Sequence, residues 1–176
     1  MADNYIERYA RRKTTSSAPI MIEVQINGAR TRAANPHIPV THREIADEVL
    51  AVSAAGASII HAHNTDFMLH GEDAYDDYMK SWDVILAVRP DLLWYCTTTI
   101  DEDRTRMGLE HAQLLIQRAG MRMGCVDPGA ANVAHGQDEN GNLRGRTYMW
   151  TLDQISRQIA MYRRHDAGIV LGIYEP

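Results

Sequence analysis

Two histidines, His61 and His63, stand one residue apart at the end of an apolar run that begins at Ala57. Side chains two residues apart in an extended strand point to the same face, so both imidazoles would lie side by side at a strand tip. Imidazole nitrogens are common zinc ligands, and a catalytic zinc usually takes three ligands from protein. The spacing therefore predicts two ligands of a metal site.

Polar side chains also stand at the ends of three other predicted strands. Asn27 ends the first strand, Tyr95 and Thr97 lie two residues apart on the third, and Cys125 and Asp127 repeat this spacing on the fourth. The carboxyl ends of barrel strands carry the functional groups of that fold. Together with the histidine pair, these residues form the pattern expected of a site.

Some of these residues have a plainer interpretation as well. Cys125, like Cys96, fits a small core position, and Glu23 on the first strand fits either a site carboxylate or a surface residue. The stripe of Tyr75, Tyr78 and Trp82 has helical spacing, which favours helix packing. These alternatives stay open at the level of the sequence.

Predicted strands and helices alternate along the chain. Strands are expected at residues 20–27, 58–63, 92–98, 121–127 and 169–174, and helices from the capping box at Thr41 to Gly56, at 72–88, at 103–118, and from the capping box at Thr151 to about Arg164. The polar residues 137–145 predict a loop or hairpin. Strands separated by single helices indicate βαβ units and a parallel sheet.

Five strands and four helices are a little over half of a (β/α)8 barrel, which needs about 200–250 residues. The expected fold is therefore α/β, of the TIM-barrel family, with a partial barrel domain at residues 19–176 after a polar N-terminal arm at residues 1–18. No Gly-x-Gly-x-x-Gly loop is present, which disfavours dinucleotide binding.

Composition narrows the partners and the compartment. The 176 residues carry a formal net charge of −5, which does not favour nucleic acid or membrane surfaces. Two cysteines are too few for a disulfide framework, and no apolar run of about 18 residues predicts a transmembrane helix. A cytoplasmic protein is expected.

Several motifs, in this order, resemble the β-keto acid cleavage enzymes, a family that includes the 3-keto-5-aminohexanoate cleavage enzyme. The resemblance covers about residues 19–175, and its specific part runs from Gly28 to His63. The motifs are Gly28-Ala29-x-Thr31, Asn35-Pro36, Ile38-Pro39-Val40-Thr41, Glu44-Ile45-Ala46, Ala55 to His63, Pro90-Asp91-Leu92-Leu93, Thr97-Thr98 and Asp127-Pro128-Gly129-x-x-Asn132.

The resemblance implies a (β/α)8 barrel, a zinc or other divalent metal, and a homo-oligomer, commonly a tetramer. It implies that a β-keto acid and acetyl-CoA, the co-substrate, give acetoacetate and a new acyl-CoA. The metal ligands fall on His61 and His63, and the catalytic Ser/Thr falls on Thr97. A third ligand, a glutamate, with a catalytic arginine and aspartate, is expected on a late strand after residue 176.

The substrate-binding candidates are Glu23, Asn27, Tyr95, Cys125 and Asp127. The family's pattern is broken at three places that help to choose the substrate. Arg30 replaces a glutamate, Asn64-Thr65-Asp66 replaces a segment that often holds an arginine, and Gly172 aligns with another glutamate. The sequence therefore leaves the identity of the β-keto acid open.

Two other functions remain as alternatives. A different metal-dependent hydrolase could use a His-x-His strand tip, although Asp66 follows three residues after His63, which does not fit His-x-His-x-Asp-His. Amidohydrolases usually carry the motif on the first strand, and here it is on the second. The other alternative is a non-catalytic half-barrel whose open sheet edges favour association or low stability.

Overall fold

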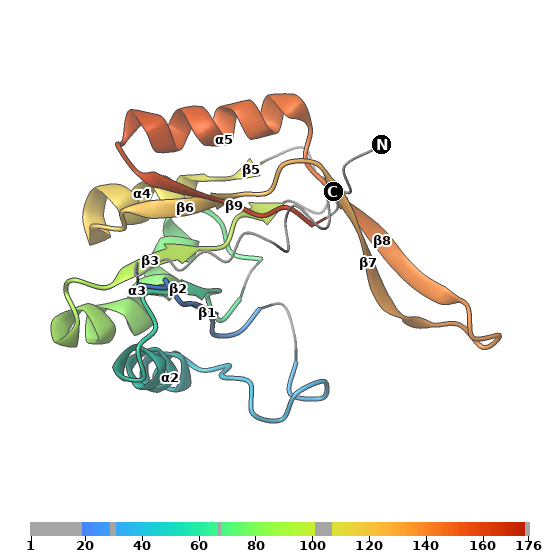
Figure 1. Ribbon diagram of the computed structural model, residues 1–176, viewed down its shortest axis with the longest axis horizontal. Coiled ribbons are helices and arrows are strands. Elements are labelled where there is room, and N and C mark those ends of the chain that lie inside the picture. Colours follow the sequence, from blue (N-terminus) through green and yellow to red (C-terminus); the bar gives the residue numbers. More distant parts are fainter. Residues whose placement is uncertain (1–18, 29–30, 67, 101–106, 175–176) are drawn as a thin grey trace, which may run out of the picture.

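The computed structural model describes residues 19–28, 31–66, 68–100 and 107–174; the predicted polar arm at residues 1–18 lies outside this part. The first half of the chain forms a regular β-α-β-α-β succession (Figure 1). Its elements are β1 (Glu23–Gln25), α2 (His42–Ala54), β2 (Ile59–Ala62), α3 (Gly71–Val88) and β3 (Leu93–Cys96).

The second half adds two further strands of the parallel type and a hairpin. Its elements are β4 (Thr99–Ile100), β5 (Met107–Gly108), α4 (Glu110–Ala119), β6 (Met123–Val126), β7 (Ala130–Gln137), β8 (Leu143–Met149), α5 (Leu152–Arg164) and β9 (Gly168–Leu171). Strands β1, β2 and β3 form one parallel sheet, and β6 pairs with β9 in a second parallel pair. The predicted α/β fold with parallel βα units is confirmed.

The two parallel groups lie next to each other through β3 and β6. Cys125 of β6 donates its thiol hydrogen to the carbonyl of Cys96 in β3, at 3.7 Å. The spatial order is thus β1, β2, β3, β6, β9, the order in which the five predicted strands occur along the chain. Over the described residues these strands do not close into a barrel.

The predicted capping boxes explain where two helices begin. The Thr41 side chain accepts from the Glu44 backbone N–H while the Glu44 carboxylate accepts from the Thr41 N–H, so α2 starts with its first donors satisfied. Thr151 and Gln154 make the same reciprocal pair at α5. At the other end of α4, Gly120 takes the left-handed conformation, which a residue without a Cβ adopts freely.

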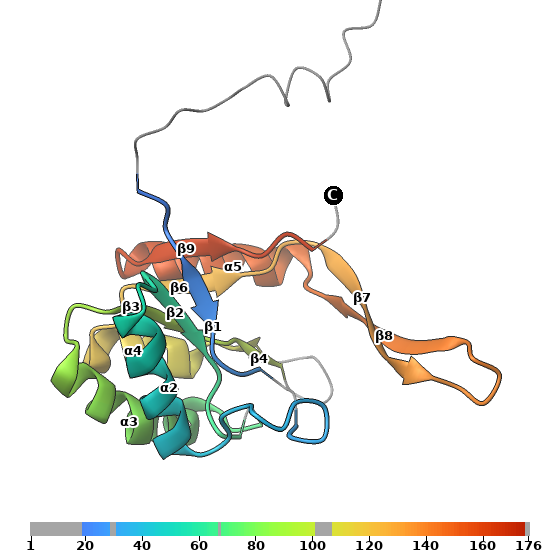
Figure 2. The same ribbon diagram turned by 60° about the horizontal axis from the view of Figure 1, so that its bottom comes forward.

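Two local predictions differ from the structure. A helix was expected from residue 103, but Met107–Gly108 pair with Thr99–Ile100 as short antiparallel strands, and α4 begins at Glu110; residues 103–106 lie outside the described part. The expected loop or hairpin at 137–145 is the end of a longer hairpin. Strands β7 and β8 form a ribbon that projects from the body of the molecule (Figures 1 and 2).

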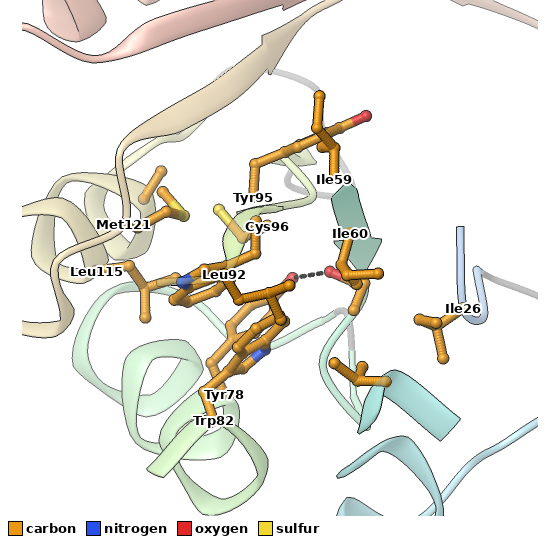
Figure 3. Close-up of a cluster of buried hydrophobic side chains, with 14 of the residues drawn as sticks. Ile26, Ile59, Ile60, Tyr78, Trp82, Leu92, Tyr95, Cys96, Leu115 and Met121 are labelled. Atoms are coloured by element: carbon orange, nitrogen blue, oxygen red, sulfur yellow. Dashed lines mark hydrogen bonds between the residues drawn. The ribbon is translucent and has the colours of Figure 1, made fainter. Parts of the chain in front are cut away.

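The core lies between the sheet and the helices on its outer face. Trp82 of α3 stacks on Trp94 of β3, with ring centroids 3.7 Å apart, and both are buried. Figure 3 shows Tyr78 and Trp82 reaching from α3 toward the strands, with Leu115 and Met121 beside them. Burial of such large apolar side chains is the dominant stabilising contribution to the fold.

Strand periodicity divides the sheet into two faces. Ile60, Ala62, Trp94, Cys96 and Val126 are almost fully buried on the face that the helices cover. The alternate positions point away from the helices because successive strand side chains point to opposite faces. They hold the predicted site residues of these strands. His61 and Tyr95 are buried, and the others keep partial exposure: Glu23, His63, Thr97, Cys125 and Asp127.

Candidate metal centre

The two imidazoles lie together at the carboxyl end of β2. His61 is within the strand and pairs in register with Tyr95 of β3, and His63 follows the last strand residue, Ala62. The ring centroids of the two histidines are 5.2 Å apart, with planes at 79°, and the His61 ring stacks on Tyr95 at 4.5 Å. The predicted side-by-side placement is therefore present in the folded chain.

Burial keeps both imidazoles neutral. It lowers the pKa of His61 to about 4, against the opposing effect of a hydrogen bond with the Tyr95 backbone. Burial, with a smaller effect from neighbouring His61, also lowers the pKa of His63 to about 4. Neutral imidazole is the form that binds metal, so at neutral pH neither ring has to lose a proton first.

One nitrogen of each ring is left without a partner. The Nδ1 atoms of His61 and His63 are buried and, within the described part of the chain, make no hydrogen bond. Buried polar atoms are nearly always paired, so two neighbouring exceptions suit a ligand. No group of three or more His, Cys, Asp or Glu side chains suited to a metal occurs among the described residues. The two histidines are thus the residues here that could hold a divalent metal, as two of its ligands.

Asn27, two residues after the end of β1, contacts the backbone of the second histidine. Its Nδ2 donates to the His63 carbonyl at 3.1 Å, and its Oδ1 accepts from the His63 N–H at 2.7 Å. The side chain is half-buried. It therefore holds the residue that follows β2 against β1.

Thr97, the predicted catalytic residue, follows β3 as His63 follows β2. Its backbone is held from the helix layer: its N–H donates to the Tyr78 hydroxyl at 3.1 Å, which in turn donates to the Ala62 carbonyl at 3.2 Å. The His111 Nε2 donates to the Thr97 carbonyl at 2.8 Å. These bonds fix the ends of β2 and β3 where the strand pairing stops.

A buried carboxylate anchors the loop that follows the histidines. Asp77 of α3 accepts from the Thr65 backbone N–H at 2.8 Å and lies 2.7 Å from the His42 Nε2. These hydrogen bonds hold the pKa of Asp77 below its usual value, although burial acts in the opposite direction. Both Asp77 and His42 were given no role from the sequence.

Glu23 and Tyr95, both predicted to bind substrate, contact each other. The Tyr95 hydroxyl donates to the Glu23 Oε1 at 2.5 Å. Burial and the neighbouring carboxylate raise the pKa of the Tyr95 phenol well above its usual value. Since His61 stacks on Tyr95, the structure brings Glu23, Tyr95 and the histidine pair into one cluster.

Cys125 lies on β6, the strand next to β3, and Asp127 follows the last residue of β6. Burial raises the pKa of the Cys125 thiol to about 12, so it is not a thiolate nucleophile at neutral pH. The Asp127 Oδ2 accepts from the Tyr148 hydroxyl at 2.6 Å, and Trp150 Nε1 donates to that hydroxyl at 2.6 Å. Burial raises the pKa of Asp127 above its usual value.

Sequence reasoning missed several of these supporting residues. The helical spacing of Tyr78 predicts packing alone, and no motif includes His111, yet both hold the backbone of Thr97. A tyrosine in a buried helical stripe still needs a partner for its hydroxyl, and that requirement is the signal that could have identified Tyr78. Tyr148 lies in a strand that was not predicted, so nothing placed it near Asp127.

Comparison with known families now bears on this arrangement. The family described as beta-keto acid cleavage enzyme matches residues 19–176, nearly the whole chain. The chain belongs to this family. A comparison with curated proteins found no match. Membership of the β-keto acid cleavage enzyme family implies an enzyme, and the family suggests small-molecule substrates. Of the helices in the described part, none is long and apolar enough to cross a membrane.

Proposed function

We propose that this chain carries the metal-dependent part of a β-keto acid cleavage site on a (β/α)8-type barrel. Its zinc or other divalent metal would be held by His61 and His63. The observation that carries the proposal is the pair of buried Nδ1 atoms, adjacent and without a partner among the described residues, in a chain of this family.

The proposed reaction exchanges acyl groups between a β-keto acid and acetyl-CoA. A proton leaves the carbon between the keto and carboxylate groups, and the resulting carbanion attacks the acetyl thioester. This attack expels the CoA thiolate, which then adds to the original keto carbonyl. Cleavage of the carbon–carbon bond at that carbonyl gives the new acyl-CoA and the acetoacetate carbanion, which takes up a proton. A bound divalent metal supplies the positive charge that favours the initial loss of a proton.

The chain's own residues would orient the substrate on the face of the sheet away from the helices. Thr97, as the catalytic residue, would present its hydroxyl beside His63, because Tyr78 and His111 fix its backbone. Glu23 and Tyr95 would form one side of the substrate site, and Cys125 and Asp127 the other. Asn27 is proposed for substrate binding because it follows β1 at the same end of the sheet. Its carboxamide contacts the backbone of His63.

The decisive experiment measures acyl-CoA and acetoacetate formation from a panel of β-keto acids with acetyl-CoA, in parallel with ester and amide hydrolysis. Acyl transfer with no hydrolysis is expected, and hydrolysis alone would instead favour the different metal-dependent hydrolase. A chain that binds zinc but has neither activity would favour a non-catalytic half-barrel. Oligomer size, for which a tetramer is proposed, can be measured on the same sample by light scattering.

Metal content tests the site itself. His61→Ala and His63→Ala are each expected to abolish stoichiometric zinc, measured by elemental analysis after gel filtration. His37→Ala is the matched control, because His37 is exposed and lies in the loop before α2. Zinc retained by both site variants would overturn the assignment.

A further inference from the structure

The Asn27 side chain takes the place of a peptide group at the end of a β-ladder. The regular pairing of β1 with β2 reaches the hydrogen bond from the Ile26 N–H to the His61 carbonyl, at 3.0 Å. In a parallel ladder, the His63 N–H would next donate to a backbone carbonyl of β1. Here it donates to the Asn27 Oδ1 instead, at 2.7 Å.

A carboxamide has the same donor and acceptor as a peptide group, so it can replace one on both sides of a residue. The Asn27 Nδ2 also donates to the His63 carbonyl, at 3.1 Å. The N–H and the C=O of His63 are therefore both held by one side chain. These two groups flank the Cα of His63, so their fixation sets the direction in which its imidazole leaves the backbone.

This contact matters because His63 lies one residue beyond the end of β2. Its neighbour His61 is held within the strand, but His63 lacks that regular pairing. A metal needs both nitrogens at fixed positions, and groups that orient ligands typically change metal affinity 10–100-fold when they are removed.

We propose that Asn27 is a positioning residue that holds His63 in the orientation required for metal binding. The inference rests on the proposed function, since it takes His61 and His63 as metal ligands. Both polar atoms of the carboxamide are engaged with His63, so its effect on metal binding acts through that histidine.

The test is a Co²⁺ titration of the full chain, followed by visible absorption, for the unchanged protein and for Asn27→Leu. Asn27→Leu removes both hydrogen bonds at similar side-chain volume, and we expect Co²⁺ affinity to fall about tenfold or more, with a changed d–d spectrum. Asn35→Leu is the matched control. Asn35 also accepts a backbone hydrogen bond, from His37 at 3.0 Å, but in an exposed loop.

Hydrogen exchange of the metal-free protein gives a second readout. In Asn27→Leu the His63 amide should exchange about fivefold faster, because loss of one net hydrogen bond is worth about 1 kcal/mol, while the Ile26 amide stays protected. If Asn27→Leu does not fold, Asn27→Ser provides the same test, because a serine side chain is too short to bond both the N–H and the C=O of His63.

The outcomes separate the two proposals. Weaker Co²⁺ binding in Asn27→Leu, with Asn35→Leu unchanged, supports the positioning role. Unchanged Co²⁺ affinity in Asn27→Leu, beside an unchanged protein that does bind, overturns this inference and leaves the proposed function intact. Absence of Co²⁺ binding by the unchanged protein overturns the proposed function and this inference with it.

Discussion

The carboxyl ends of β2 and β6 differ in whether their buried polar side chains have hydrogen-bond partners. After β2, the Nδ1 atoms of His61 and His63 are buried and, over the described residues, unpaired. After β6, Asp127 accepts from Tyr148, whose hydroxyl accepts from Trp150, so these three side chains are paired with one another. Both strands are four residues long and they lie on either side of β3, so strand length does not explain the contrast.

This is the difference expected between a place that binds a ligand, as proposed for the β2 end, and a place that only stabilises the fold. An unpaired buried polar group lowers stability by about 1–3 kcal/mol, whereas a satisfied one does not. The β2 end keeps this unfavourable contribution while its backbone is fully held by Asn27 and Tyr78. Fixed backbone with free ring nitrogens is the arrangement expected of preorganised metal ligands.

The largest expected effect is on metal-linked stability. Zinc at 100 times its dissociation constant should raise the free energy of unfolding by about 2.7 kcal/mol, because it binds only the folded state. His63→Ala should lose this gain, and Asp127→Ala should keep it, because the proposed metal site lies at the β2 end. Urea unfolding with and without EDTA measures both; equal gains in the two variants would remove the contrast.

Acidification should then destabilise the metal-free protein. The pKa of His61 and of His63 is about 4 in the folded chain and about 6.5 when exposed, so the unfolded state binds more protons between these values. The two imidazoles therefore make their full contribution to the free energy of unfolding above pH 6.5. This contribution is lost as pH falls toward 4, by about 2 kcal/mol per imidazole at pH 5.

Urea unfolding in EDTA at pH 7, 6 and 5 measures this loss. His61→Phe removes one titrating group and should flatten the pH dependence. Asp127 acts in the opposite direction, because its raised pKa lets the folded state hold the proton further above pH 3.8. A pH dependence that His61→Phe leaves as steep as before would refute the assignment of the loss to the histidines.

Removal of the Asp127 carboxylate should destabilise the β6 end by about 2 kcal/mol, because the Tyr148 hydroxyl loses its acceptor. Asp127→Ala is the test variant, measured by urea unfolding at pH 7. Asp127→Asn should lose less, since it keeps an acceptor and burial already disfavours the charged carboxylate. Asp153→Ala, in an exposed pair with Arg157, should change stability by less than about 0.5 kcal/mol.

The smallest effect is expected where the Tyr78 hydroxyl, on α3, bonds to the backbone at the ends of β2 and β3. Tyr78→Phe leaves the Thr97 N–H and the Ala62 carbonyl without the hydroxyl that bridges them, which should lower stability by about 1 kcal/mol. Tyr75→Phe, on the half-buried side of the same helix, is the control. Thermal unfolding distinguishes them, and equal losses would show that the bridge is not the cause.

The sequence by itself determined the alternation of strands and helices, both capping boxes, and the pairing of His61 with His63. These depend on local rules: strand periodicity, the reciprocal side-chain bonds of a helix start, and a spacing of two residues. The family resemblance is likewise confirmed, over residues 19–176. Local patterns suffice here because each involves residues only a few positions apart.

Only the tertiary structure decided which groups support the site. Asn27 reaches His63 across 36 positions, Tyr78 bridges two strand ends, and Tyr148 reaches Asp127 from a hairpin strand that extends beyond the predicted loop or hairpin at 137–145. It also decided the charge state of the histidines, because burial by distant segments lowers the pKa of His61 to about 4. Desolvation and hydrogen bonding depend on what packs nearby in space, and sequence spacing does not encode that.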